Sequence, residues 1–132
     1  MLKKLKAWWR KFFNPNVRRG RKGERAAVRF LKKQNYKILA RNCSFGRYEL
    51  DIVAQKDGCI VFVEVRGRSE NCFQNGYYSV NYKKKAALRK AVNAFLKYHR
   101  KANTYRFDII SIDWHANKIT ALNHYENVPL GQ

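Results

Sequence analysis

Acidic residues and one arginine with the potential for chemistry lie in the segment 47–68, RYELDIVAQKDGCIVFVEVRGR. If this segment folds as a hairpin, Asp51 faces Glu64 and Glu49 faces Arg66, all on one face of the two strands. Opposed carboxylates repel each other, and a divalent cation held by hard oxygen ligands would offset that repulsion. The alternative is a cross-strand ion pair of Glu49 with Arg66 and two solvated acids. Because both strands are apolar elsewhere, we favour a site.

A tight turn at Asp57-Gly58 would fix this register, because that dipeptide supplies the positive φ angles of a type I′ turn. The opposed pairs on the charged face are then Gln55 with Ile60, Val53 with Phe62, Asp51 with Glu64, and Glu49 with Arg66. The other face pairs Ala54 with Val61, Ile52 with Val63, and Leu50 with Val65. Since this second face is wholly apolar, another layer must cover it.

Hydrophobic periodicity predicts the elements around the hairpin. The expected order is a helix, three strands, a helix and two strands, which gives an α/β fold with a mixed β-sheet flanked by helices. A long helix between strands is typical of a crossover to a parallel neighbour. The expected helices span 23–34 and 83–101, and the expected strands outside the hairpin span 36–42, 105–113 and 118–124.

Two residues on the inward sides of these helices are candidates for a supporting role. Glu24 lies one turn before Val28, where an acid in the first helical turn ordinarily serves the helix dipole. It could instead reach the acidic patch if the helix packs across the sheet. Lys84 lies one turn before Leu88, which favours an orientation toward the sheet.

The charge of the chain predicts a polyanionic partner. Its 132 residues hold 29 lysines and arginines against 9 acids, a formal net charge of +20, so nucleic acid is the first partner to consider and an anionic membrane the second. Three cysteines without a C-x-x-C spacing argue against a disulfide framework and a structural zinc site, and favour the cytoplasm. No apolar run reaches the length of a membrane span, and no secretion signal is expected.

The chain divides into a basic N-terminal extension, 1–22, and an α/β domain, 23–132. The extension contains no acid, and aromatic and aliphatic residues alternate with its cations. Residues 3–13 are expected to form a short amphipathic helix that ends at Asn14-Pro15-Asn16. It could be a membrane-surface helix, a nucleic-acid arm, or an ordinary helix packed on the domain.

The hairpin, together with Glu24, Arg41-Asn42 and Arg106-Phe107-Asp108, carries a resemblance. The segments YELDIV and VFVEVRGR resemble the D…(E/D)-x-K signature of restriction-endonuclease-like nucleases. More narrowly, the chain is similar from Gly23 to about Val128 to the small bacterial proteins of the UPF0102 family. The resemblance implies a restriction-endonuclease-like fold, also described as Holliday-junction-resolvase-like or tRNA-endonuclease-like.

The resemblance also implies a metal-dependent endonuclease for structured DNA or RNA, with DNA the stronger expectation. Asp51 and Glu64 would hold Mg²⁺ or Mn²⁺ with Glu49, and Glu24 would support them. Arg66 stands where the signature has lysine, and Lys84 could supply the missing amine. Junction-cutting nucleases of this fold act as dimers, so a homodimer is a further expectation. The expected phosphate contacts are Arg47, Arg68, Lys83, Lys84 and Lys85.

A second interpretation keeps the fold and the basic surface but removes turnover. The protein would then be a catalytically inactive nucleic-acid-binding module, with the acids as an ion-pair network. In this interpretation residues 1–22 could also attach it to a membrane surface.

Overall fold

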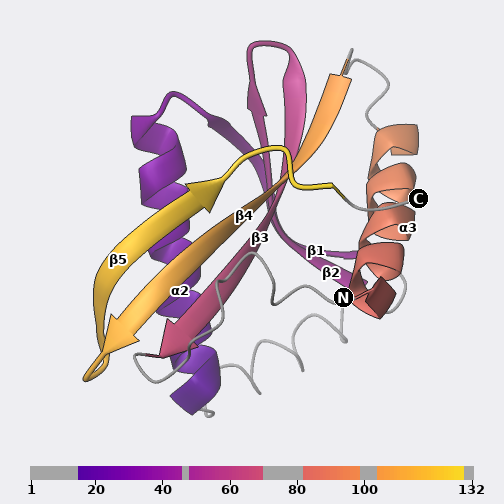
Figure 1. Cartoon of the computed structure of the whole chain (residues 1–132). Helices are drawn as coiled ribbons and strands as arrows, with labels where there is room; N and C mark the ends of the chain where they lie inside the picture. The colour runs from indigo at the N-terminus through magenta and orange to yellow at the C-terminus, as the bar shows by residue number, and fades with distance from the viewer. Residues whose placement is uncertain (1–14, 46–47, 70–81, 99–103, 130–132) are drawn as a thin grey trace.

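The computed structural model describes residues 15–45, 48–69, 82–98 and 104–129 (Figure 1). It confirms the predicted order of one helix, three strands, a second helix and two strands. The elements are α2 (Pro15–Lys33), β1 (Lys37–Phe45), β2 (Tyr48–Lys56), β3 (Cys59–Ser69), α3 (Tyr82–Tyr98), β4 (Thr104–His115) and β5 (Lys118–Tyr125).

The strands form one five-stranded mixed sheet in the order β1-β2-β3-β4-β5. Neighbouring strands are antiparallel except β3 and β4, which are parallel and joined through α3. The predicted parallel neighbour of the crossover is therefore confirmed. None of the helices in the described ranges is long and apolar enough to cross a membrane.

The two helices cover opposite faces of the sheet, so the fold has three layers (Figure 1). On one face, Ala27, Val28 and Leu31 of α2 pack against strand residues that include Ile52 and Val63. On the other face, Leu88, Ala91, Val92 and Phe95 of α3 pack against Val53, Phe62 and Ile109, among others. The layer that the apolar face of the hairpin required is thus α2.

The central hairpin folds in the predicted register at its turn. Lys56 pairs with Cys59, and the regular pairs continue to Ile52 with Val63. Both turn residues have positive φ angles, 51° at Asp57 and 78° at Gly58, as a type I′ turn requires.

Beyond Ile52 and Val63 the simple alternation of faces ends. The prediction that Leu50 shares the apolar face with Val65 is wrong. Leu50 packs on the α3 side of the sheet, whereas Ile52 packs on the α2 side. In β1, Ala40 and Cys43 both pack on the α3 side although they are three residues apart. Both strands therefore change face at one level, where Asn42 has a left-handed φ of 52°.

The start of α2 also differs from the expectation. The helix begins at Pro15, because proline fits the first helical position, where its missing N–H would have no partner within the helix. The helix runs through the point between residues 22 and 23 at which the extension was divided from the domain, and that division stays a prediction. The expected helix over 3–13 lies outside the described residues.

Substitution of two glycines by alanine should change the stability of the fold in opposite directions. At neither Gly20 nor Gly58 does another atom lie within 4 Å of the position that a Cβ would take. Gly58→Ala places a side chain on a left-handed backbone and should destabilise the fold by about 1 kcal/mol. Gly20→Ala lies within α2 and should stabilise it by about 0.5–1 kcal/mol, since glycine is a poor helix former. Urea unfolding of both variants tests this. Stabilisation by both would contradict the assigned turn, and destabilisation by both would contradict the helical position of Gly20.

Candidate functional site

Asp51 reaches from β2 to β3 at the point where their regular pairing ends. Its Oδ2 accepts a hydrogen bond of 2.9 Å from the backbone N–H of Val65. This places the Asp51 carboxylate beside the peptide that follows Glu64. The predicted facing pairs of Asp51 with Glu64 and of Glu49 with Arg66 are not among the strand pairs of the described hairpin, which stop at Ile52 and Val63.

Glu64 and Arg66 form an ion pair along β3. Val63 and Val65 pack on the α2 side, so alternation places Glu64 on the α3 side. Glu64 is only 4% exposed, and its Oε1 lies 3.3 Å from Nε of Arg66. That Nε is nevertheless buried without a hydrogen-bond acceptor among the described residues. Leaving a buried donor without an acceptor costs about 1–3 kcal/mol, so this position favours the binding of an oxygen acceptor.

Glu24 and Glu49 are joined through Asn42, which the sequence singled out only as part of the family resemblance and not as a site residue. With its amide nitrogen turned toward the acids, Asn42 donates to Oε1 of Glu24 at 3.0 Å and to Oε1 of Glu49 at 3.2 Å. The first turn of α2 contains no acid, so Glu24 does not serve the helix dipole there. It is buried at 8% exposure, and its described contact with the sheet is the one with Asn42. Whether it also reaches Asp51 and Glu64 stays a prediction.

The described contacts connect each of the four acids to a neighbouring residue. Asp51 contacts the backbone of β3 at Val65, and Glu64 pairs with Arg66 on the same strand. Glu24 and Glu49 share Asn42. Within the described ranges, no three acidic, histidine or cysteine side chains are grouped so that they could hold a metal ion.

The expected phosphate contacts fall largely outside what the structure describes. Arg47 is not described, and the side chains of Arg68 and of Lys83, Lys84 and Lys85 are not described either. The backbone places Arg68 on β3 opposite Asp113 of β4 and the three lysines at the start of α3.

A second polar cluster surrounds Asp108, which is fully buried on β4. Arg106 donates to it through Nε and through NH2, each at 3.0 Å, and Nε2 of His124 lies 2.7 Å from Oδ2. The backbone N–H of Asn127 donates to Oδ1 at 2.9 Å, and Arg106 also donates to the hydroxyl of Tyr36. The signal in the sequence is the Arg-x-Asp spacing, which puts both side chains on one face of a strand.

The cluster keeps Asp108 ionised. Burial by itself would raise its pKa, but the hydrogen bonds of His124, Arg106 and Asn127 outweigh burial and hold the pKa below the ordinary value. The hydrogen bond with Asp108 raises the pKa of Arg106, and burial raises that of Tyr36. Because an ionised carboxylate has no proton to donate, Nε2 of His124 must carry hydrogen. The cluster joins the segment before β1, β4, β5 and the segment after β5.

Comparison with known proteins identifies the family. Residues 23–112 match the model of "Uncharacterised protein family UPF0102". The chain belongs to this family. A UPF0102 protein of Carboxydothermus hydrogenoformans is 42% identical over 113 residues, which cover 83% of this chain and 92% of the relative. One of Flavobacterium johnsoniae is 43% identical over 97 residues, covering 70% and 79% of the two chains.

The span that the UPF0102 model matches includes Glu24, Asn42, Glu49, Asp51, Glu64 and Arg66 and also reaches Asp108. It ends at residue 112, so His124 and Asn127 lie beyond it. The resemblance predicted from the sequence is therefore confirmed at the level of the family.

Asn42→Asp should destabilise the protein at neutral pH by about 1–3 kcal/mol. It replaces the shared donor by a third carboxylate, while aspartate tolerates the left-handed backbone. The repulsion should raise the pKa of the new group, so the loss should shrink as the pH falls toward about 5 and the group takes up a proton. Thermal unfolding across this range tests the idea. A loss that does not change with pH would contradict the shared-donor arrangement.

Asp108→Asn should cost about 3–5 kcal/mol at neutral pH, because it breaks a buried ion pair and turns an amide toward converging donors. The pKa of Asp108 is lowered by folding, so its contribution is present above the unfolded value of about 3.9 and is lost as the pH falls through the folded value. The gap between wild type and variant in urea unfolding should therefore close in acid.

Glu126→Gln is the matched control for Asp108→Asn. Its carboxylate is 59% exposed and lies 3.9 Å from NH2 of Arg106, so its loss should cost less than about 1 kcal/mol. Equal losses in the two variants would contradict a special role for the buried carboxylate.

Proposed function

We propose that the protein is a metal-dependent endonuclease of the restriction-endonuclease-like class, acting on structured DNA or RNA. The observation that carries the proposal is the buried Nε of Arg66, which has no hydrogen-bond acceptor among the described residues and lies beside a buried glutamate. A phosphate oxygen is an acceptor of the right charge, and arginine binds phosphate through its planar array of donors.

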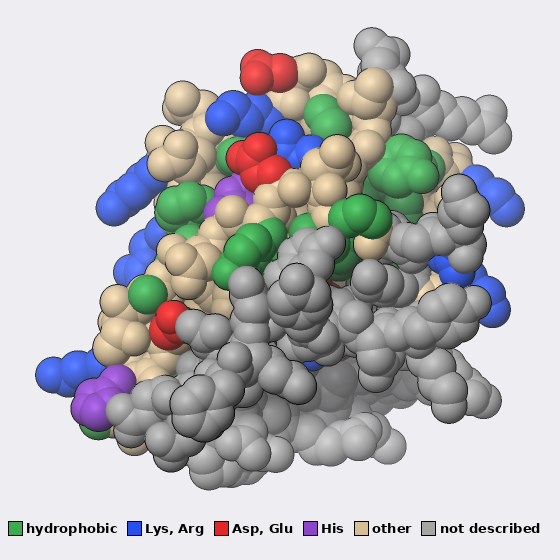
Figure 2. Space-filling view, viewed as in Figure 1, with side chains coloured by type: hydrophobic (Ala, Val, Ile, Leu, Met, Phe, Trp, Pro, Cys, Tyr) green, Lys and Arg blue, Asp and Glu red, His purple; other side chains and the backbone are tan. Residues whose placement is uncertain are grey.

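The net charge of +20 supports a polyanionic substrate. On the face shown in Figure 2, lysine and arginine side chains project from both edges of the molecule. Membership of UPF0102, together with the Asp51, Glu64 and Arg66 spacing that resembles the nuclease signature, supports the reaction class.

The donor set suits a hard divalent cation bound in part by the substrate. Mg²⁺ commonly takes one or two carboxylates and completes its shell with water and substrate phosphate, so it does not need a cage of three protein ligands. Asp51 and Glu64 are the acids that would hold it, with Glu49 and Glu24 joined behind them through Asn42. When bound, the metal would polarise the phosphate and activate water.

Arg66 has a different task from the lysine of the signature. A guanidinium stays protonated and cannot accept a proton from water. Arg66 instead binds the phosphate and stabilises the charge that develops on it. The hydrogen bond from Val65 holds the carboxylate of Asp51 in place during this step.

Conservative variants test the proposal against the binding module that is the alternative. Asp51→Asn and Glu64→Gln keep the size of each side chain, and the amide oxygen introduced at position 51 can still accept the hydrogen bond from Val65. Either should reduce Mg²⁺- or Mn²⁺-dependent cleavage at least about a hundredfold. The assay uses forks, nicked duplexes, four-way junctions and hairpin RNA, and DNA binding in EDTA should remain.

Glu126→Gln again serves as the control, since it removes an exposed carboxylate and should leave cleavage unchanged. Arg66→Met should abolish cleavage, and Arg66→Lys should retain part of it. Absence of cleavage by the wild-type protein on every substrate with both metals would leave the binding module as the function.

A further inference from the structure

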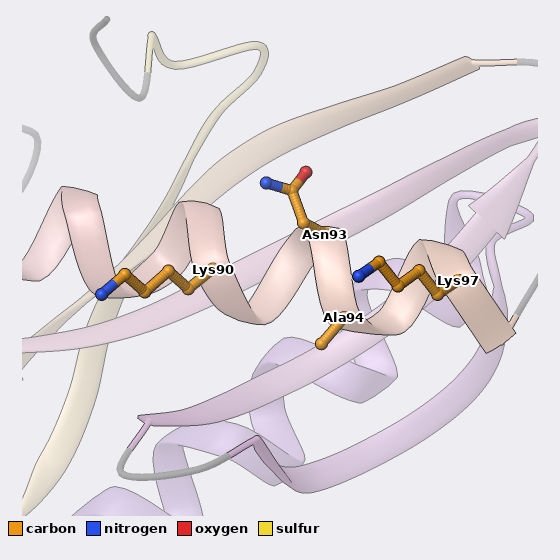
Figure 3. Close-up of a pocket in the computed structure, with 4 residues that line it drawn as sticks. All are labelled: Lys90, Asn93, Ala94 and Lys97. Atoms are coloured by element: carbon orange, nitrogen blue, oxygen red, sulfur yellow. The ribbon is translucent and has the colours of Figure 1, made fainter.

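The outer side of α3 carries a cationic hollow whose described lining includes none of the acids of the candidate site. The hollow has a volume of about 470 Å³ and is lined by Lys90, Asn93, Ala94 and Lys97. Figure 3 shows these residues on one stretch of α3, with the side chains of Lys90 and Lys97 extending in the same direction along the helix.

The polar side chains of this hollow are available to a ligand. Lys90, Asn93 and Lys97 are exposed. Neither lysine takes part in a salt bridge or a hydrogen bond within the described ranges. The sequence of α3, YKKKAALRKAVNAFLKY, contains no acid that could neutralise them from the same helix. An anionic ligand is therefore the one that the hollow favours.

The apolar side of α3 is buried in the core, and this distinguishes between two kinds of anionic partner, a membrane surface and a nucleic acid. A helix that lies on a membrane needs an apolar face to insert below the headgroups. In α3 that face consists of Leu88, Ala91, Val92 and Phe95, and all four are buried against the sheet. The residues described around the hollow add the methyl group of Ala94 and the aliphatic stems of the lysines to two ammonium groups and one amide, but they form no apolar face large enough to insert into a bilayer. This lining suits a phosphodiester backbone better than a lipid surface.

The spacing of the two lysines also fits a nucleic-acid strand. Lys90 and Lys97 lie seven positions apart in the helix, which corresponds to a rise of about 10.5 Å along the axis. Because a strand of a duplex winds around the axis while it rises about 3.4 Å per step, the lysines would contact phosphates fewer than three steps apart. Asn93 lies between them and can both donate and accept a hydrogen bond.

We propose that this face of α3 is a second nucleic-acid contact, at which Lys90 and Lys97 bind the phosphates of one strand and Asn93 contacts the sugar-phosphate backbone between them. The proposal rests on nucleic acid as the ligand of the proposed function and does not require cleavage. The contact reads no sequence, because phosphate contacts position a strand without specifying its bases.

The test compares the full-length double variant Lys90→Ala/Lys97→Ala with Lys32→Ala/Lys33→Ala. The control removes the same charge from exposed lysines at the end of α2, on the other side of the sheet. Binding of a labelled DNA fork is measured in EDTA at several salt concentrations. Each lost phosphate contact should lower the slope of log affinity against log salt by about 0.7–0.9. The α3 variant should therefore lose about 1.4–1.8 in slope, and the control less than half of that.

Equal changes in the two variants would overturn the proposal, since the effect would then be one of total charge alone. An unchanged slope in the α3 variant, or no binding of the fork by the wild-type protein, would overturn it too. So would weaker binding to phosphatidylglycerol vesicles with DNA binding unaffected, which would indicate a lipid surface. If the wild-type protein binds the fork but never cleaves it, the nuclease proposal fails. The change in salt slope still tests the nucleic-acid contact on α3 in that case.

Discussion

The hydrogen bond from the N–H of Val65 to the carboxylate of Asp51 is the interaction on which the candidate site depends. Regular pairing between β2 and β3 stops at Ile52 and Val63, so backbone groups beyond that level need other partners. The Asp51 side chain supplies one of them. This hydrogen bond therefore connects β2 to β3 beyond their last regular pair, and it also holds a carboxylate beside the peptide that follows Glu64.

The change of face in β1 and β2 occurs at the level of the acids, where the alternation predicted for the hairpin no longer holds. Strict alternation would have put Glu49 and Asp51 on one side of the sheet with Glu64. Asn42 adopts a left-handed backbone at this level, and its amide donates to Glu49 and to Glu24 of α2. An amide shared by two carboxylates offsets part of their repulsion where α2 packs on the sheet.

The periodicity of the sequence was enough to predict the elements, their order, the turn at Asp57-Gly58 and the parallel partner of the crossover. These features depend on local pattern and on general rules of connection. The face of Leu50 could not be predicted in the same way, because it depends on the backbone of Asn42 in the neighbouring strand. The start of α2 was missed because Asn14-Pro15-Asn16 can either end one helix or begin the next.

The Asp108 cluster shows a further limit of reading a sequence residue by residue. His124 has no partner close to it in the sequence, because Asp108 lies sixteen positions earlier on the adjacent strand. Tyr36, Arg106 and Asn127 are similarly dispersed along the chain. The cluster connects the segment before β1, β4, β5 and the segment after β5 on the α2 side, whereas Glu64 and the hollow of α3 lie on the other side. A fully ionised, fully satisfied carboxylate has no capacity left for a substrate. Arg66, whose buried Nε still lacks a hydrogen-bond acceptor among the described residues, has that capacity, and this difference makes the Glu64 side of the sheet the place to look for chemistry.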